Sequence, residues 1–251
     1  MEHHRIASDR APNVTIMPTT EDASQTVADM FLATVRTNPA CRLGLATGQT
    51  PRRIYAKLVD AVRAGRISFA DVETINLDEY CGLPAAHPDS FAAYMHRELF
   101  SSAGFDAAKI NLIDGAATDE AAEAVRYANL VRSRPVDLQL LGIGTNGHIG
   151  FNEPGSSASS RVRVVELSKE TLAANQPTLI ELHEVPARAI TMGIADILDA
   201  RKIVILATGE AKAEAVRRSL MEHPDDNCPA SHLALHADVH WVLDQAAAGL
   251  L

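Results

Sequence analysis

Residues Val136 to Pro154 read VDLQLLGIGTNGHIGFNEP, and they join a strand-like run to a loop rich in reactive side chains. The first six residues form an apolar run that is typical of a buried strand. The following residues include glycines, which let a backbone approach a ligand closely, and His148 and Glu153, which belong to the common proton-transfer types. Open α/β sheets bind ligands beyond the carboxyl ends of their strands, so this loop is the first candidate site.

The rest of the chain alternates strand-like runs with amphipathic helical patterns. We expect strands at 13–17, 42–46, 72–76, 136–141, 202–206 and 240–243, and helices at 22–35, 52–64, 90–100 and 121–133. The runs at 136–141 and 202–206 are the most apolar and are expected at the centre of the sheet. This alternation predicts βαβ units and therefore an α/β fold with a mostly parallel sheet flanked by helices. We expect residues 1–251 to form a single domain, since no linker or repeat divides them.

The composition favours a cytoplasmic protein with a small-molecule ligand. The formal net charge of −9 argues against a nucleic-acid partner, although local groups can still bind an anion. Three cysteines, Cys41, Cys81 and Cys228, form no CxxC pair, as expected in a reducing compartment. No stretch approaches 18 uninterrupted apolar residues, and the N-terminus lacks the apolar region of a secretion signal, so we expect no membrane association.

The glycine pattern of the loop also matches a dinucleotide-binding fingerprint. Gly142, Gly144 and Gly147 have the GxGxxG spacing and follow a strand. A helix should come next, but Gly150 and Pro154 would break it within about two turns. A nicotinamide or flavin cofactor is therefore not favoured.

Two further loops have the composition of anion sites. After the strand at 42–46, the amides of Gly48 and Gln49 and the hydroxyl of Thr50 would lie at a helix N-terminus. After the strand at 202–206, Lys212 could reach the same anion. An ordinary capped turn and a surface lysine are the alternatives, and the sequence leaves both open.

Asp78 is the candidate base beside His148 and Glu153. It lies next to Glu79 at the end of the run 72–76. Adjacent side chains of an extended chain point to opposite sides, so only one of these carboxylates can face a pocket. A turn-initiating aspartate is the alternative.

The spacing of His232, His236 and His240 invites a metal interpretation, but Pro229 and the strand at 240–243 leave too little helix for a shared face. No cysteine or carboxylate completes a tetrahedral set, and we expect no metal site.

Several segments together resemble the glucosamine-6-phosphate deaminase (glucosamine-6-phosphate isomerase) family. They are LGLATGQTP (43–51), INLDEYCGLPAAHPDSF (75–91), LLGIGTNGHIGFNEPGSS (140–157), VPARAITMGIADILDA (185–200), GEAKAEAV (209–216) and PASHLALH (229–236). The NGHIGFNEP portion is specific, since the related 6-phosphogluconolactonases differ there. The resemblance implies a modified Rossmann-like fold with a small lid segment at about 160–185. It also implies conversion of D-glucosamine 6-phosphate and water to D-fructose 6-phosphate and ammonia, without a cofactor.

The resemblance also assigns roles to residues. His148 would open the sugar ring, and Glu153 would orient the His148 side chain. Asp78 would remove the proton from C2 of the sugar. Asn146 would join the ring-opening relay, where some family members carry aspartate. Because an amide cannot take up a proton, Asn146 can only orient His148 by hydrogen bonding. Gly48, Gln49, Thr50 and Lys212 would hold the phosphate.

One departure from the family concerns the lid. Family members commonly carry an arginine shortly after an Ala-Asn pair, where it binds the phosphate. Here Ala174-Asn175 is followed by Gln176-Pro177 without an arginine. The loop at 48–50 and Lys212 then remain to hold the phosphate, with Arg163 or Arg188 as candidate substitutes. Galactosamine 6-phosphate or another amino-sugar phosphate therefore stays open as the substrate.

Two other functions remain as alternatives, a 6-phosphogluconolactonase and a sugar-phosphate-sensing effector domain. A lactonase should not need Asp78, and an effector should carry a DNA-binding helix-turn-helix, for which the N-terminal region has no room. Family members differ in oligomeric state, so a homo-oligomer stays open.

Overall fold

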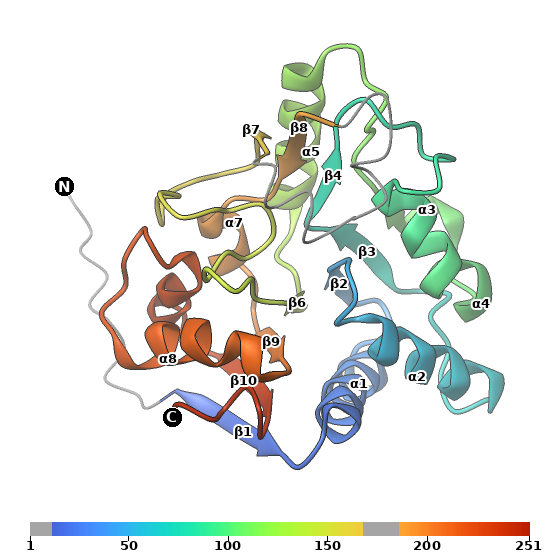
Figure 1. Cartoon of the computed structure of the whole chain (residues 1–251). Coiled ribbons are helices and arrows are strands. Elements are labelled where there is room, and N and C mark those ends of the chain that lie inside the picture. Colours follow the sequence, from blue (N-terminus) through green and yellow to red (C-terminus); the bar gives the residue numbers. More distant parts are fainter. Residues whose placement is uncertain (1–11, 168–185) are drawn as a thin grey trace.

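A computed structural model describes residues 12–167 and 186–251 of the chain. Seven parallel strands form its main sheet (Figure 1). In spatial order they are β1 (Asn13–Met17), β10 (Val239–Asp244), β9 (Ile203–Ala207), β6 (Leu138–Leu141), β2 (Arg42–Leu45), β3 (Glu73–Asn76) and β5 (Ile110–Asn111). The two most apolar strands, β6 and β9, lie near the centre as expected, because both faces of a central parallel strand are covered.

Helices cover both faces of this sheet, which confirms the expected α/β class. The helical segments are α1 (Thr20–Thr37), α2 (Arg52–Arg63), α3 (Phe91–Met95), α4 (Ser101–Ala103), α5 (Glu120–Ser133), α7 (Ile194–Leu198) and α8 (Ala213–Met221), with 3₁₀ segments η2 (Ala107–Lys109), η4 (Glu210–Lys212) and η5 (Pro229–Leu235). Right-handed crossovers place α1 to α4 on one face and α5, α7 and α8 on the other. In agreement, α1 packs on α2, and α8 packs on η5.

The expected helix at 90–100 is not one uniform helix. After α3 the backbone changes to a π-helical turn, η1 (His96–Phe100), before α4 begins. Periodicity alone cannot separate these states, because both bury apolar residues at similar spacing.

A second, antiparallel sheet corrects the expected placement of Asp78. The run that begins near residue 72 does not continue through it. Strand β3 ends at Asn76, and β4 (Asp78–Tyr80) pairs with β8 (Arg188–Thr191), which pairs with β7 (Arg163–Glu166). Leu77 joins the two sheets, since its N–H donates to Leu45 O and its carbonyl accepts from Met192 N. Part of the segment expected as a lid thus belongs to β7, and residues 168–185 lie outside the described residues.

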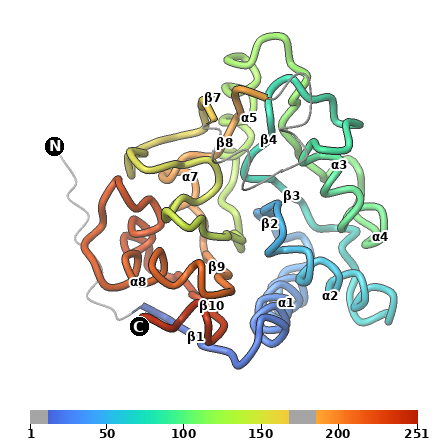
Figure 2. The backbone as a smooth tube through the Cα atoms, viewed as in Figure 1, coloured from blue at the N-terminus to red at the C-terminus, as the bar shows by residue number. Residues whose placement is uncertain are grey.

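The direction of the connections reverses between β2 and β6. These strands are paired in the sheet. Figure 2 shows the backbone trace with β2 beside β3. The connection after β2 leads toward β3, whereas the connection after β6 leads the opposite way to β9. Such a reversal is where open α/β sheets bind ligands. The candidate site residues lie in the segments that follow β9, β6, β2 and β3, with Asp78 at the start of β4 and Lys212 at the end of η4.

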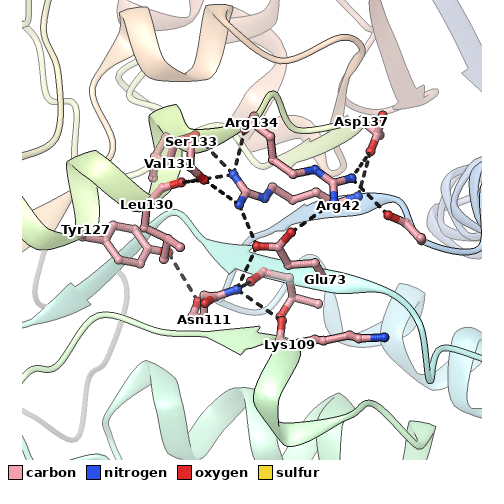
Figure 3. Close-up of polar contacts among 12 residues, drawn as sticks. Arg42, Glu73, Lys109, Asn111, Tyr127, Leu130, Val131, Ser133, Arg134 and Asp137 are labelled. Carbon is pink, nitrogen blue, oxygen red and sulfur yellow. Dashed lines mark hydrogen bonds and ion pairs between the residues drawn. The ribbon is translucent and has the colours of Figure 1, made fainter.

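A buried arginine stabilises the opposite end of the strands, where β2, β3 and β6 begin (Figure 3). The Arg42 side chain is only 2% exposed, and Nη2 lies 2.6 Å from Glu73 Oε1. Its Nη1 donates to the carbonyl oxygens of Leu130, Val131 and Arg134. These carbonyls close the C-terminal end of α5, where a cation is favourable.

Candidate active site

Three side chains of the loop after β6 form one hydrogen-bonded chain. Asn146 Nδ2 donates to Glu153 Oε2 over 2.9 Å, and Asn146 Oδ1 lies 2.8 Å from His148 Nδ1. The direct distance from His148 Nδ1 to Glu153 Oε1 is longer, 3.7 Å. Because an amide oxygen can only accept, His148 Nδ1 carries the proton. Neutral His148 therefore leaves Nε2 as its basic nitrogen.

Burial and two charges act on the titration of His148. Burial lowers the pKa of His148 most, the Glu153 carboxylate raises it, and the Lys212 ammonium lowers it further. The net direction is downward, which favours the neutral imidazole. Since Lys212 acts on this ring, the loop after β9 lies close enough to His148 to influence its charge.

Glycines make room for the His148 ring. A methyl group on Gly144 would lie 2.2 Å from two atoms of that ring, whereas one on Gly142 would meet nothing within 4 Å. Gly147 has a φ of +88°, which favours glycine, and Cys228 Sγ fills the space beside it. The loop is also held by hydrogen bonds from Ala230 N to Gly147 O and from Gly155 N to Asp226 O.

Asp78 meets this same loop. A methyl group on Gly150, whose φ is +56°, would lie 3.2 Å from Asp78 Oδ2 and 3.2 Å from Thr191 Oγ1. Asp78 and Thr191 are also directly paired in the small sheet. Burial, and secondarily the charge of Glu79, raise the pKa of Asp78 to about 8. The structure therefore brings Asp78 to the loop of His148 and Glu153, although these side chains come from different sheets.

Glu79 points away from the site, as expected for the neighbour of Asp78 in a strand. Its carboxylate accepts hydrogen bonds from the backbone N–H groups of Tyr80, Phe91 and Ala92. The last two belong to the first turn of α3, where a carboxylate satisfies free amides. Burial raises the pKa of Glu79 to about 7, while these hydrogen bonds oppose the shift.

The loop after β2 has the form of an anion site. Gly48 has a φ of +100°, and its carbonyl accepts from the Tyr94 hydroxyl over 2.6 Å. Helix α2 then starts without a side-chain cap and without an acidic residue in its first turn. Its N-terminal amides are thus open to an anionic ligand.

A cavity of about 500 Å³ opens beside this loop, and we call it the arginine cavity. It is lined by Thr20, Gln49, Thr50, Arg52, Arg53 and Thr208. Gln49 and Thr50 were expected to bind a phosphate, whereas Gly48 does not line the cavity. Sequence reasoning missed Arg52 and Arg53, because two arginines at a helix start look like ordinary solvated residues.

Lys212 ends η4 after β9 and is half-buried. Burial lowers the pKa of Lys212. Within the described residues no carboxylate forms an ion pair with it. A partly desolvated cation near His148 suits an anionic ligand, but Lys212 does not line the arginine cavity.

The two arginines considered as substitutes for a lid arginine have other partners. Arg188 Nη2 lies 3.0 Å from Glu120 Oε1. Arg163 donates to Asn152 Oδ1 over 2.9 Å and to Ser156 Oγ over 3.2 Å, so it supports the segment around Glu153. The lid residues 174–177 themselves lie outside the described residues.

The three histidines of the spacing pattern make separate contacts. His232 Nε2 lies 2.8 Å from Asp226 Oδ1, His236 Nε2 lies 2.7 Å from Ala200 O, and His240 Nε2 lies 3.0 Å from Asp238 Oδ1. Among residues 12–167 and 186–251, no group of three His, Cys, Asp or Glu side chains is arranged to hold a metal ion. In the same ranges, every helix is too short or too polar to cross a membrane.

Comparison with known proteins gives a consistent result. The family model described as glucosamine-6-phosphate isomerases/6-phosphogluconolactonase matches residues 18–241. A glucosamine-6-phosphate deaminase of Rhodopirellula baltica is 50% identical over 239 residues, which is 95% of this chain and 95% of that protein. Glucosamine-6-phosphate deaminase 1 of Bacillus subtilis is 42% identical over 92% of this chain and 96% of its own length.

Solved structures agree with this result. A monomeric glucosamine-6-phosphate deaminase superposes with a TM-score of 0.90 at 41% identity, over 95% of this chain and all of its own. A 6-phosphogluconolactonase of Trypanosoma brucei has a TM-score of 0.76 at 21% identity, over 96% of this chain and 98% of its own, and shares the fold. The chain belongs to the glucosamine-6-phosphate deaminase family, which is related to the 6-phosphogluconolactonases.

Proposed function

We propose that the protein is a glucosamine-6-phosphate deaminase that converts D-glucosamine 6-phosphate and water to D-fructose 6-phosphate and ammonia. Relatives that are 41–50% identical over nearly the whole chain carry that activity in their names. The observation that carries the proposal is the meeting of Asp78 with the His148 loop at Gly150. The approach of a candidate acceptor for a carbon-bound proton to the loop of a candidate proton carrier for oxygen supports an isomerisation with ring opening.

Ring opening is the first step. His148 Nε2 takes the proton of the anomeric hydroxyl and returns a proton to the ring oxygen, which breaks the C1–O5 bond and leaves an aldehyde. Asn146 supports this by holding Nδ1–H, and Glu153 stabilises the imidazolium through Asn146 and through its own charge. His148 therefore carries out both proton transfers, because the amide of Asn146, which lies between His148 and Glu153, cannot pass on a proton.

Isomerisation follows at C1 and C2. The Asp78 carboxylate removes the C2 proton beside the aldehyde, which produces an enolamine, and delivers a proton to C1. The resulting C2 imine adds water and releases ammonia, leaving the ketone of fructose 6-phosphate. A carboxylate with a raised pKa is a stronger base than an ordinary one, which suits removal of a carbon-bound proton.

Ammonia release is the decisive assay. Purified protein is incubated with glucosamine 6-phosphate, with galactosamine 6-phosphate and with 6-phosphogluconolactone, and ammonia and acid are measured. We expect ammonia from glucosamine 6-phosphate, a much smaller yield from its epimer and no lactone hydrolysis above the spontaneous rate. Equal turnover of the two amino sugars would refute the epimer assignment, and lactone hydrolysis alone would refute the deaminase.

A further inference from the structure

Thr191 joins the two parts of the candidate site that come from different sheets. It is fully buried at the end of β8, where it is the direct cross-strand partner of Asp78 in the small antiparallel sheet. Its Oγ1 accepts a hydrogen bond over 3.2 Å from the backbone N–H of Phe151, in the loop after β6. One side chain thus ties the strand of Asp78 to the loop that carries His148.

Further contacts fix Phe151 and its neighbour against the small sheet. The Phe151 ring stacks on Phe91, with ring centroids 5.9 Å apart and an interplanar angle of 12°. The next residue, Asn152, is fully buried and donates from Nδ2 to Met192 O over 2.8 Å, directly after β8. The loop is therefore held at the end of β8, and the oxygen atom of Thr191 has a defined position.

The hydroxyl proton of Thr191, in contrast, is held weakly. It is directed to the carbonyl oxygen of Met192 over 3.3 Å, which is long for an O–H···O hydrogen bond. That carbonyl already accepts from Asn152. The hydrogen bond from Phe151 uses only a lone pair of the Thr191 oxygen, so the hydroxyl proton can turn to another acceptor.

The Asp78 carboxylate is an acceptor beside this hydroxyl. Within 12–167 and 186–251, no hydrogen-bond donor reaches it, and burial and the charge of Glu79 both oppose its ionised form. A methyl group on Gly150 would lie 3.2 Å from Asp78 Oδ2 and also 3.2 Å from Thr191 Oγ1, so the two oxygens flank the same point of the loop. Directly paired residues of an antiparallel sheet stand on one face, with Cβ atoms about 5 Å apart. Rotation of the Thr191 hydroxyl therefore brings a donor toward the carboxylate.

We propose that Thr191 is a positioning residue for proton transfer at C2: its hydroxyl donates to the ionised Asp78 carboxylate and fixes the orientation of that base. This inference rests on the proposed function and adds to it a residue that acts through Asp78. A hydrogen bond to the charged form of a carboxylic acid favours ionisation and restricts rotation of the carboxylate. The chemical step is unchanged, since Asp78 takes the C2 proton and delivers a proton to C1 while the Thr191 hydroxyl keeps its own.

Steady-state kinetics of ammonia release tests the proposal with Thr191→Val, which removes the hydroxyl at nearly constant shape. We expect kcat to fall about tenfold or more, the effect of one hydrogen bond to a charged group, while KM stays within about threefold. The primary isotope effect with glucosamine 6-phosphate deuterated at C2 should rise, because proton removal becomes slower relative to the other steps. Thr191→Ser, which keeps the hydroxyl, should retain kcat within about threefold of the original protein.

Thr74→Val is the matched control. Thr74 is also fully buried in a strand, but no described residue forms a hydrogen bond with its hydroxyl. This variant should keep kcat, KM and the isotope effect within about twofold. If Thr191→Val does not fold, Thr191→Cys takes its place with the same expectations, because a thiol is only a weak donor.

The titration of the Asp78 carboxyl group gives an independent measurement that needs no turnover. It can be followed by NMR in protein labelled at the aspartate carboxyl carbons, with Asp78→Asn to assign the signal. The pKa of Asp78 is about 8 in the original protein, and loss of the Thr191 donor should move the titration to higher pH, because the charged form loses a hydrogen bond.

An unchanged titration of Asp78 in Thr191→Val would overturn the proposal even if kcat fell, since the fall would then come from a displaced loop. An unchanged kcat would overturn it as well. If the unmodified protein released no ammonia, the proposed function would fail separately, and the carboxyl titration would still decide whether Thr191 acts on Asp78.

Discussion

The amide of Asn146 determines how Glu153 acts on His148. It accepts from His148 Nδ1 and donates to Glu153 Oε2, so a carboxylate influences the imidazole through a group that cannot titrate. The amide therefore keeps His148 in one tautomer, while the Glu153 carboxylate lies farther from Nδ1, at 3.7 Å. An aspartate at this position would change both properties.

We predict that Asn146→Asp raises the pKa of His148, because a second carboxylate stabilises the imidazolium. The ring titration of His148 can be followed by NMR, and the pH profile of kcat/KM should shift with it. Asn146→Ser, which keeps a small hydrogen-bonding group without a charge, is the control. Profiles of Asn146→Asp that cannot be distinguished from those of the original protein would contradict a role for this position.

The burial of Asp78 lowers the stability of the folded protein when its carboxyl group is ionised. Its folded pKa of about 8 lies above the ordinary value of 3.8, so the folded protein binds more protons than the unfolded chain between these values. The contribution of Asp78 to the free energy of unfolding therefore falls as the pH rises through this window.

We predict that Asp78→Asn lowers kcat by about 10²–10⁴-fold, the usual contribution of a general base. The same variant should be more stable than the original protein at pH 8.5, by on the order of 2 kcal/mol, with a smaller difference at pH 5. Urea denaturation at the two pH values measures this. A stability difference that shrinks as the pH rises would show that the Asp78 carboxyl is not desolvated.

At the scale of elements, the backbone of the loop after β6 packs closely against the ring of His148. Gly142→Ala and Gly144→Ala add the same methyl group two residues apart, and only the second would collide with His148. We predict that Gly144→Ala lowers kcat/KM at least about 100-fold, because a displaced general acid–base loses most of its contribution, whereas Gly142→Ala stays within about threefold. Equal activities would mean that the ring moves freely.

Elements with strong local patterns could be predicted from the sequence. Six of the seven parallel strands and the helices α1, α2 and α5 lie within a few residues of their expected bounds, since apolar periodicity and turn residues specify them, whereas the two-residue strand β5 was not predicted. The loop with Asn146, His148 and Glu153 was also identified from its residues. The short strands β4, β7 and β8 could not be predicted in the same way, because three or four residues carry little periodicity and their pairing joins residues far apart in the chain.

The same limit applied to the site. The contact of Asp78 with Gly150 depends on the chain leaving one sheet at Leu77 and entering the other, which no local pattern encodes. Similarly, Arg52 and Arg53 gain significance only from the cavity that α1, α2 and the loop after β9 enclose around them. Side chains from separate elements become a site only when the topology is known.

At the scale of the whole molecule, the candidate site and the stabilising cluster around Arg42 lie at opposite ends of the strands of the main sheet. The reactive loops follow the carboxyl ends of β9, β6, β2 and β3, whereas Arg42 and its partners lie where β2, β3 and β6 begin (Figure 3). Arg42 joins the start of the sheet to the end of α5. Removing it would take the shortest of its ion-pair contacts from Glu73, which Arg134 also contacts, and would leave helix carbonyls without this side-chain donor.

We therefore predict that Arg42→Met lowers the free energy of unfolding by about 3 kcal/mol, as for breaking a buried ion pair, while KM and kcat of the folded protein stay within about twofold. Arg201→Met is the control, because Arg201 is 68% exposed and its ion pair with Asp137 should contribute less than about 1 kcal/mol. Urea denaturation and ammonia-release kinetics on the same preparations separate the two effects. A large change in KM at full stability would mean that the two edges of the sheet are coupled, since the start of β2 would then control the loop at its end.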